Sequence, residues 1–148
     1  VRGVVLAAAA ARRVSPEIAA TVAIASDMNG DRNGRLAALR LGFFAPGNDP
    51  TPWLDGWHAD ANRAHTAATA ATPRSEFWHA GSAPILEIIP EHDPFKPRAS
   101  WDETRAELGG RVATVRVADA SHALFPEQPG AVIEAIAAFS AGVDGHSG

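Results

Sequence analysis

The chain has 148 residues, of which 46% are hydrophobic and 20% charged, as expected for one globular domain that buries a core of its own. Its net charge of −4 and its lack of cysteine exclude a basic surface for nucleic acid or membranes, disulfides and thiolate metal sites. No apolar run approaches the roughly 20 residues that span a bilayer, so we expect a cytoplasmic protein.

The first predicted element is a strand at residues 3–10. This run is continuously apolar and begins with β-branched residues, which is typical of a strand covered on both faces in a parallel sheet. The chain enters the run directly and does not begin with Met. We therefore expect that an N-terminal part of a larger protein precedes Val1.

Residues 11–82 are predicted to form a helical excursion between two strands. In its first helix, Ser15 stands at the N-cap and Pro16 at the first helical position. The predicted helices cover residues 15–26, 33–47 and 53–72. A crossover between parallel strands needs only about a dozen residues, so this segment is long enough to be an inserted subdomain.

Two further strands are predicted in the second half of the chain. Residues 83–89 form another apolar run, interrupted only by Glu87, and predict a buried strand. Residues 111–118 alternate apolar and polar side chains, with Val115 and Val117 on one face. This alternation predicts a strand with one wetter face, as at the edge of a sheet.

A helix is predicted after each of these strands. In residues 100–110, Ser100 and Glu103 have the spacing of a capping box and two glycines follow the helix. Residues 128–142 form the last predicted helix. Its apolar face is expected to comprise Val132, Ile133, Ile136 and Phe139. Alternating strands and helices predict an α/β protein with a parallel crossover.

Two side chains that can carry chemistry follow these neighbouring strands. Asp93 lies in the run IIPEHDPFKP after the second strand, and His122 follows the third strand. Taken separately, Asp93 is better explained as a turn or cap residue and His122 as an exposed loop histidine. Because the carboxyl ends of parallel strands share one sheet edge, the paired placement favours a carboxylate that orients an imidazole.

The sequence around these two residues resembles the α/β-hydrolase family. PILEIIPEHDPFKP is similar to the family's seventh strand with the triad acid, and VATVRVADASHALFPEQPGAVIEAIAAF to the eighth strand, histidine loop and last helix. VRGVVLAAAA is similar to the sixth strand. One departure is Ser121, where the family usually has glycine, which makes this loop less permissive.

The resemblance implies the C-terminal part of an α/β-hydrolase fold. It would contain three parallel strands with flanking helices and a helical cap insertion. The implied divisions are a core of residues 1–10 and 83–142, a cap of residues 11–82 and a flexible tail of residues 143–148. The N-terminal half of the fold is then expected on the same or on another chain.

The resemblance also implies a catalytic triad of which this sequence holds two members. Asp93 would be the acid and His122 the base, but the G-x-S-x-G elbow of the nucleophile is absent from the chain. Ser82 lies at the opposite end of its strand, roughly 17–20 Å from Asp93. Ser121 adjoins His122 too closely for serine–imidazole geometry. We therefore expect that neither serine is the nucleophile.

Other polar and aromatic residues suggest no cofactor. His58 and His65 are seven residues apart but lack a third ligand, so a surface pair is favoured over a metal site, and we expect neither a metal nor a cofactor. The aromatic residues of the cap are interpreted mainly as its core, with one or two lining an apolar substrate pocket. The candidate substrate-binding residues are Trp53, Trp57, Trp78, Leu124 and Phe125.

Three functional hypotheses remain open at this point. The first is a fragment of a serine hydrolase for a small carboxylic ester or lactone, inert alone. The second is an enzyme similar to haloalkane dehalogenases, with an upstream aspartate as nucleophile. Epoxide hydrolases of this family use cap tyrosines, and the chain has none. The third hypothesis is a non-catalytic binding module derived from a hydrolase.

Overall fold

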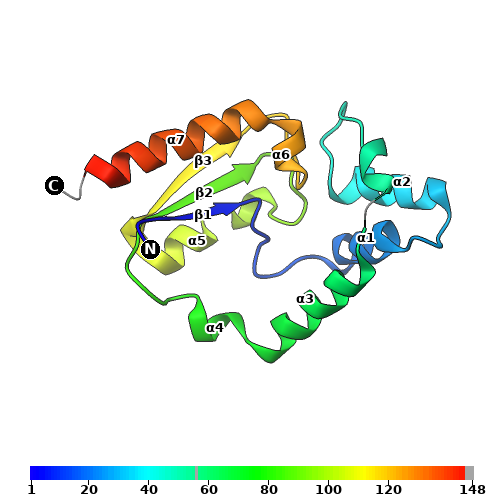
Figure 1. Cartoon of the computed structure of the whole chain (residues 1–148), viewed down its shortest axis with the longest axis horizontal. Helices are drawn as coiled ribbons and strands as arrows, with labels where there is room; N and C mark the ends of the chain where they lie inside the picture. Colours follow the sequence, from blue (N-terminus) through cyan, green and yellow to red (C-terminus); the bar gives the residue numbers. More distant parts are fainter. Residues whose placement is uncertain (56, 146–148) are drawn as a thin grey trace.

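The computed structural model describes residues 1–55 and 57–145 and has a parallel sheet at its centre (Figure 1). Within these residues the sheet has three strands in the order β1–β2–β3. They are β1 (Val4–Ala7), β2 (Ile85–Pro90) and β3 (Val112–Val117). Val5 pairs with Leu86, and Leu86 pairs with Ala113. The predicted parallel crossover is therefore confirmed.

Strand β2 is the central strand and is buried along its whole length. The side chains on both of its faces are buried, as expected for a strand that lies between two neighbouring strands and two layers of helix. Strand β3 pairs only with β2 among the described residues. The edge position predicted for this strand is therefore confirmed. The predicted alternation is wrong at Val115, which shares its face with Val117 but is 37% exposed, whereas Val117 is 4% exposed.

Strand β1 is shorter and more exposed than its sequence predicts. It ends at Ala7, because Ala8 adopts a positive φ of 49° and turns the chain away. Val4 and Val5 remain 36% and 37% exposed. The prediction of a strand covered on both faces is wrong for the described residues, because Val4 and Val5 point to opposite faces and both are exposed.

Helices lie on both faces of the sheet (Figure 1). Helix α7 (Pro129–Gly145) packs on the face of Leu86 and Ile88, and helix α5 (Glu103–Leu108) lies on the opposite face, to which Glu87 points. Three of the four predicted apolar residues of α7 contact the core, whereas Ile133 is 67% exposed. It follows Val132 by one residue and is therefore rotated about 100° around the helix.

The C-terminal helix is also longer than predicted. Residues 143–145, which the sequence places in a flexible tail, belong to α7. The rest of that predicted tail, residues 146–148, lies outside the described residues. None of the described helices is long and apolar enough to cross a membrane.

The segment between β1 and β2 is helical, as predicted. Helix α1 begins at Ser15, whose hydroxyl accepts a bond from the amide of Ile18 at 3.3 Å. The elements are α1 (Pro16–Ser26), α2 (Arg32–Gly42), the 3₁₀ helix η1 (Thr51–Leu54), α3 (Ala59–Ala71) and α4 (Arg74–Phe77). Helices α1 and α2 lie beyond the carboxyl ends of the strands, and α3 leads back toward their amino ends (Figure 1).

Besides the end of α7, three predicted helix boundaries are wrong. The helix of residues 33–47 ends at Gly42, where the amides of Phe43 and Phe44 both turn back to Leu39. The helix of residues 53–72 is replaced by η1 and α3, and residue 56 between them lies outside the described residues. Both boundaries depend on tertiary packing, which helix propensity does not include.

The predicted capping box at the third boundary does not form. Helix α5 begins at Glu103, after the short 3₁₀ helix η2 (Arg98–Ser100). The hydroxyl of Ser100 donates to the carbonyl of Pro97 at 2.7 Å, and Glu103 accepts from the amide of Arg12 at 3.0 Å. The helix ends before Gly109, as predicted, with the 3₁₀ helix η3 (Gly109–Arg111) leading into β3.

Helices α1 and α2 touch at Gly42. We therefore expect Gly42→Ala to reduce the free energy of unfolding by about 1–3 kcal/mol through overpacking. A Cβ atom at Gly42 would lie 2.3 Å from the Thr21 hydroxyl, which is held by a 2.6 Å bond to the carbonyl of Ile18. The measurement is the free energy of unfolding in urea. Gly34→Ala in the same helix is the matched control, because its Cβ would meet nothing closer than 3.4 Å. Equal stability of the Gly42→Ala variant and the wild type would contradict this packing.

Candidate active site

The acid loop follows β2 and holds Asp93 in a buried turn. One carboxylate oxygen of Asp93, Oδ1, accepts a hydrogen bond from the amide of Phe95 at 2.8 Å. The amide of Lys96 donates to the carbonyl of Asp93 at 3.1 Å. This is the local turn that aspartate favours, and it leaves the second oxygen of Asp93 free to face another partner.

The histidine loop follows β3 and turns sharply at Asp119, whose φ is +53°. Ser121 needs no such conformation, so serine in place of the family's glycine fits the loop without strain. Ser121 is 1% exposed, and its hydroxyl donates to the carbonyl of His92 at 3.1 Å. Ser121 is thus a structural contact between the two loops, in agreement with the expectation that it is not a nucleophile.

Main-chain hydrogen bonds join the two loops side by side. The amide of Glu91 donates to the carbonyl of Val117, and the amide of His92 donates to the carbonyl of Ala120, both at 2.9 Å. These bonds continue the pairing of β2 and β3 beyond the end of the sheet. They therefore carry Asp93 and His122, which are 29 residues apart in sequence, to one place.

Asp93 and His122 form a direct pair in the structure. The Oδ2 atom of Asp93 lies 3.0 Å from the Nδ1 atom of His122. The side chain of Asp93 is fully buried, whereas that of His122 is 27% exposed. Because a carboxylate can only accept, Nδ1 carries the proton and Nε2, on the other side of the ring, is the basic nitrogen. Such a pair can take up and release a proton at Nε2.

Two aromatic rings hold the imidazole in place. The ring centroids of Phe95 and His122 lie 4.4 Å apart. The Phe43 ring meets the His122 ring edge-on, with 5.7 Å between their centroids. Phe43 had been predicted only as part of the cap core, and Phe95 had not been selected at all. The proximity of Phe95 to Asp93 in the sequence was a usable signal for it, whereas nothing local placed Phe43 beside His122.

Two of the predicted substrate-binding residues join this aromatic group. The rings of Trp53 and Trp57 lie 6.0 and 5.6 Å from that of Phe43. Both tryptophans also line a surface cavity of about 360 Å³ together with His58. They are thus connected to His122 through Phe43, and they remain candidates for contact with a substrate.

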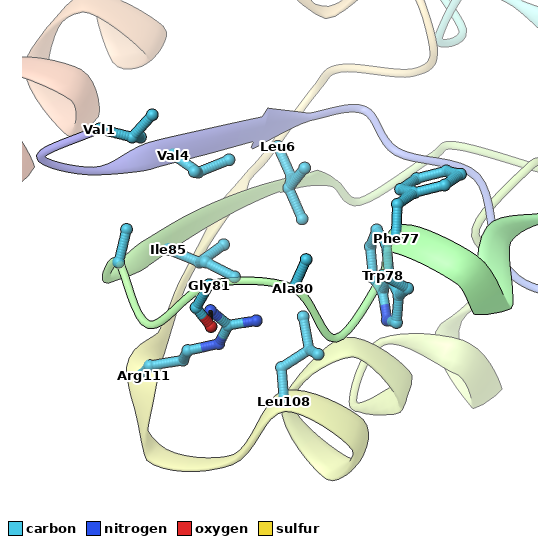
Figure 2. A pocket seen from close by; sticks show the side chains of 11 residues that line it. Val1, Val4, Leu6, Phe77, Trp78, Ala80, Gly81, Ile85, Leu108 and Arg111 are labelled. Carbon is cyan, nitrogen blue, oxygen red and sulfur yellow. Dashed lines mark hydrogen bonds between the residues drawn. The ribbon is translucent and has the colours of Figure 1, made fainter.

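The structure does not bring the other three predicted residues to this group. Leu124 is fully buried in the core between the sheet and α7, and Phe125 is 56% exposed. Trp78 lies between α4 and α5, against the side of the sheet that β1 leaves open (Figure 2). The indole of Trp78 stacks under the guanidinium of Arg74, 3.4 Å from the ring centre.

A charged cluster next to Trp78 contains the shifted pKa values of this region. Burial lowers the pKa of Arg74. Burial by itself would raise the pKa of Glu107, but this pKa is lowered, chiefly by the hydrogen bond and the charge of Arg12 and further by the charge of Arg74. Arg12 and Glu107 form an ion pair. This ion pair connects the chain after β1 with α5.

No alternative chemistry arises from the other candidate residues. Ser82 is exposed and precedes β2, at the end of the sheet opposite to Asp93. His58 and His65 are both exposed at the start and in the middle of α3. Among residues 1–55 and 57–145 there is no group of three or more His, Asp or Glu side chains that could hold a metal ion.

The parallel sheet, its flanking helices and the pair at its carboxyl edge define part of an α/β-hydrolase fold, as predicted. Solved structures with this fold are similar to the chain over nearly its whole length. A thermophilic esterase from Thermogutta terrifontis has a TM-score of 0.67 and 20% identity, and the match covers 96% of this chain and 56% of the esterase.

Two further solved structures give the same result. Carboxylesterase CesB from Bacillus subtilis has a TM-score of 0.65 and 17% identity, covering 95% of this chain and 51% of that one. A bromoperoxidase from Bacillus anthracis has a TM-score of 0.55 and 19% identity, covering 93% and 57%. The chain therefore spans about half the length of these proteins. No protein-family model matches it, and no curated protein matches its sequence.

Proposed function

We propose that this chain supplies the acid and the base of a catalytic triad in a serine hydrolase that cleaves small carboxylic esters or lactones. The observation that carries the proposal is the buried 3.0 Å contact between Asp93 and His122, which leaves Nε2 as the basic nitrogen. Structural similarity to an esterase and a carboxylesterase supports the reaction class. The nucleophile would come from residues outside this sequence, because the chain has no G-x-S-x-G elbow.

In the proposed reaction, Nε2 of His122 takes the proton of the serine hydroxyl while the serine oxygen bonds to the ester carbonyl carbon. The carboxylate of Asp93 stabilises the imidazolium that forms. The proton then passes to the leaving alcohol as the carbon–oxygen bond breaks. His122 next removes a proton from water as the water oxygen bonds to the acyl carbon. It returns this proton to the serine oxygen as the bond between serine and acyl group breaks and the acid leaves. Backbone amides outside this chain would stabilise the oxyanion.

The same proposal includes a place for the rest of the fold on the open side of β1. Along this edge the backbone of β1 is unpaired within the described residues, and such edges recruit a further strand. An apolar groove of about 410 Å³ lies next to it, between β1 and helices α4 and α5 (Figure 2). It is lined chiefly by Val4, Leu6, Phe77, Trp78 and Leu108.

The groove fits an amphipathic helix that accompanies the added strand. Phe77 is 53% exposed at its rim and Val4 is 36% exposed at its base. Covering these side chains would remove apolar surface from water, which stabilises the complex by about 25 cal/mol per Å². Arg111 closes one end by donating to the carbonyl of Gly81 at 2.7 Å.

We expect the purified 148-residue chain to be inert toward p-nitrophenyl esters, because it holds no nucleophile beside His122. The measurement is the hydrolysis rate with the His122→Ala variant of the same chain as the control. Hydrolysis is expected to appear when the chain is joined to an N-terminal segment that carries the elbow. A rate for the isolated chain that exceeds that of the His122→Ala variant would contradict the proposed division of the triad.

A further inference from the structure

Glu127 binds two separate segments of the chain at once. It is the last residue of helix α6 (Leu124–Glu127). Its Oε2 atom accepts a 2.6 Å hydrogen bond from the amide of Ser121. Its Oε1 atom accepts from the amide of Ala45 and from the side-chain nitrogen of Asn48, each at 2.6 Å. One carboxylate thus holds the histidine loop to the loop that follows α2.

The amides on both sides of His122 are held by this arrangement. Ser121 donates to Glu127, and the amide of Ala123 donates to the carbonyl of Phe43 at 2.7 Å. The side chain of Asn48 adds a 3.2 Å bond to the carbonyl of Asp119. The main chain of His122 is therefore fixed directly to the same short segment whose Phe43 ring contacts the imidazole.

We propose that Glu127 is the residue that positions His122 and fastens it to the segment of residues 43–48. This inference rests on the function proposed above. It implies that the imidazole and the aromatic group of Phe43, Trp53 and Trp57 keep one relative position. A substrate held by these rings would then meet Nε2 at a fixed distance, which is what proton transfer requires.

The chemistry of the site calls for a carboxylate. Three donors converge on two oxygens that have acceptor capacity only. Glutamine has the same shape, but it replaces one oxygen with an NH₂ group that cannot accept. At least one amide beside His122 or in residues 43–48 would then lose its partner, and a bond to a charged acceptor is among the stronger ones.

The test is the exchange of the His122 Nδ1 proton with water in the isotope-labelled chain, measured by NMR. This proton lies between the imidazole and the fully buried Asp93 carboxylate, so it should exchange slowly in the wild type. In the Glu127→Gln variant we expect exchange about tenfold faster, as for the loss of one charge-assisted bond. Amide signals of β2 and α7 should stay unchanged, because the sheet and its helix do not depend on Glu127.

A matched control is Glu134→Gln, which removes the same charge from an exposed position on α7 and should leave the exchange unchanged. If Glu127→Gln does not fold, Asn48→Ala removes only one donor and should still accelerate exchange. If Glu127→Gln folds and its Nδ1 proton exchanges at the wild-type rate, the proposal is overturned. If Glu127→Gln does not fold, a wild-type exchange rate in Asn48→Ala overturns it.

A separate variant distinguishes this inference from the function on which it rests. Asp93→Ala should remove the protection of the Nδ1 proton completely, because it removes the acceptor. If protection survives in Asp93→Ala, the acid–base pair itself is refuted, whatever the Glu127 variants show. If Asp93→Ala behaves as expected but Glu127→Gln does not, only the positioning role of Glu127 is lost.

Discussion

Replacing His122 by alanine in the enzyme that contains this chain and its nucleophile should lower kcat for ester hydrolysis by a factor of about 10⁶. In the proposed reaction, Nε2 of His122 both activates the serine and protonates the leaving group, so its loss would affect both halves of the reaction. KM should change much less, because Trp53 and Trp57 stay in place. The measurement is steady-state kinetics with a p-nitrophenyl ester.

The matched control for this experiment is His65→Ala. His65 is exposed on α3, so the same change of side chain there should leave both kinetic constants near their wild-type values. A His122→Ala enzyme that keeps a substantial fraction of wild-type kcat would show that another group accepts the serine proton. A reduced kcat that is matched by loss of the circular dichroism spectrum would instead report unfolding.

The acid–base pair could be predicted from the sequence because it depends on topology more than on detailed packing. The apolar run of β2, the alternating run of β3 and the helix predicted between them indicated two parallel neighbours, and parallel neighbours end at one edge of the sheet. Asp93 and His122 follow those two ends directly. Their 3.0 Å contact then needs only short loops, which the bonds of Glu91 and His92 hold together.

Contacts between distant segments could not be predicted in this way. Glu127 bonds to Ala45 across 82 residues of sequence, and no local pattern marks either partner. Glu103 fits the capping-box spacing with Ser100, yet it accepts from Arg12, 91 residues away. In both cases a carboxylate accepts a hydrogen bond from a backbone amide of another segment. Tertiary packing, rather than spacing in the sequence, determines which amide the carboxylate binds.

The position of each tryptophan relative to His122 was the other property that the sequence could not supply. Trp53 and Trp78 are the same residue type in one predicted cap, but only Trp53 reaches the group around His122 through Phe43. Trp78 lies under Arg74, beside the open side of β1. The path of the chain after α3 separates them, and that path is set by loops whose conformation has no periodic signature.

The second large expected effect concerns a buried ion pair under the sheet. Lys96→Met should reduce the free energy of unfolding by about 3–5 kcal/mol, as for other buried pairs that lose one partner. Glu87 is fully buried in the middle of β2, and Lys96, the only lysine of the chain, is 3% exposed. The ammonium of Lys96 binds Oε1 of Glu87 and lies 3.1 Å from the hydroxyl of Thr104.

The physical reason is the carboxylate that would remain. Methionine fills a similar volume but carries no charge, so Glu87 would keep only the 2.6 Å bond from Thr104. Its second oxygen, Oε2, already has no hydrogen-bond partner among the described residues. A buried carboxylate without a counter-ion is costly to desolvate. The measurement is urea unfolding of the isolated chain.

The double variant Glu87→Leu/Lys96→Met separates the pair from the packing around it. Replacing both charges by apolar side chains of similar volume is often neutral or stabilising, so the double variant should regain most of the stability that Lys96→Met loses. Equal stability of the single and double variants would mean that the lost volume, not the stranded charge, causes the effect. Recovery would mean that the pair contributes little net stability.

If stability recovers in this way, the remaining effect of the ion pair is to hold the acid loop, in which Lys96 lies. Lys96 follows Asp93 by three residues, and its amide donates to the carbonyl of Asp93. An ammonium anchored to the central strand therefore fixes the loop that carries Asp93, the proposed triad acid. In the double variant the Nδ1 proton of His122 should then exchange faster although the fold is stable, whereas unchanged exchange would show that the turn at Asp93 is sufficient by itself.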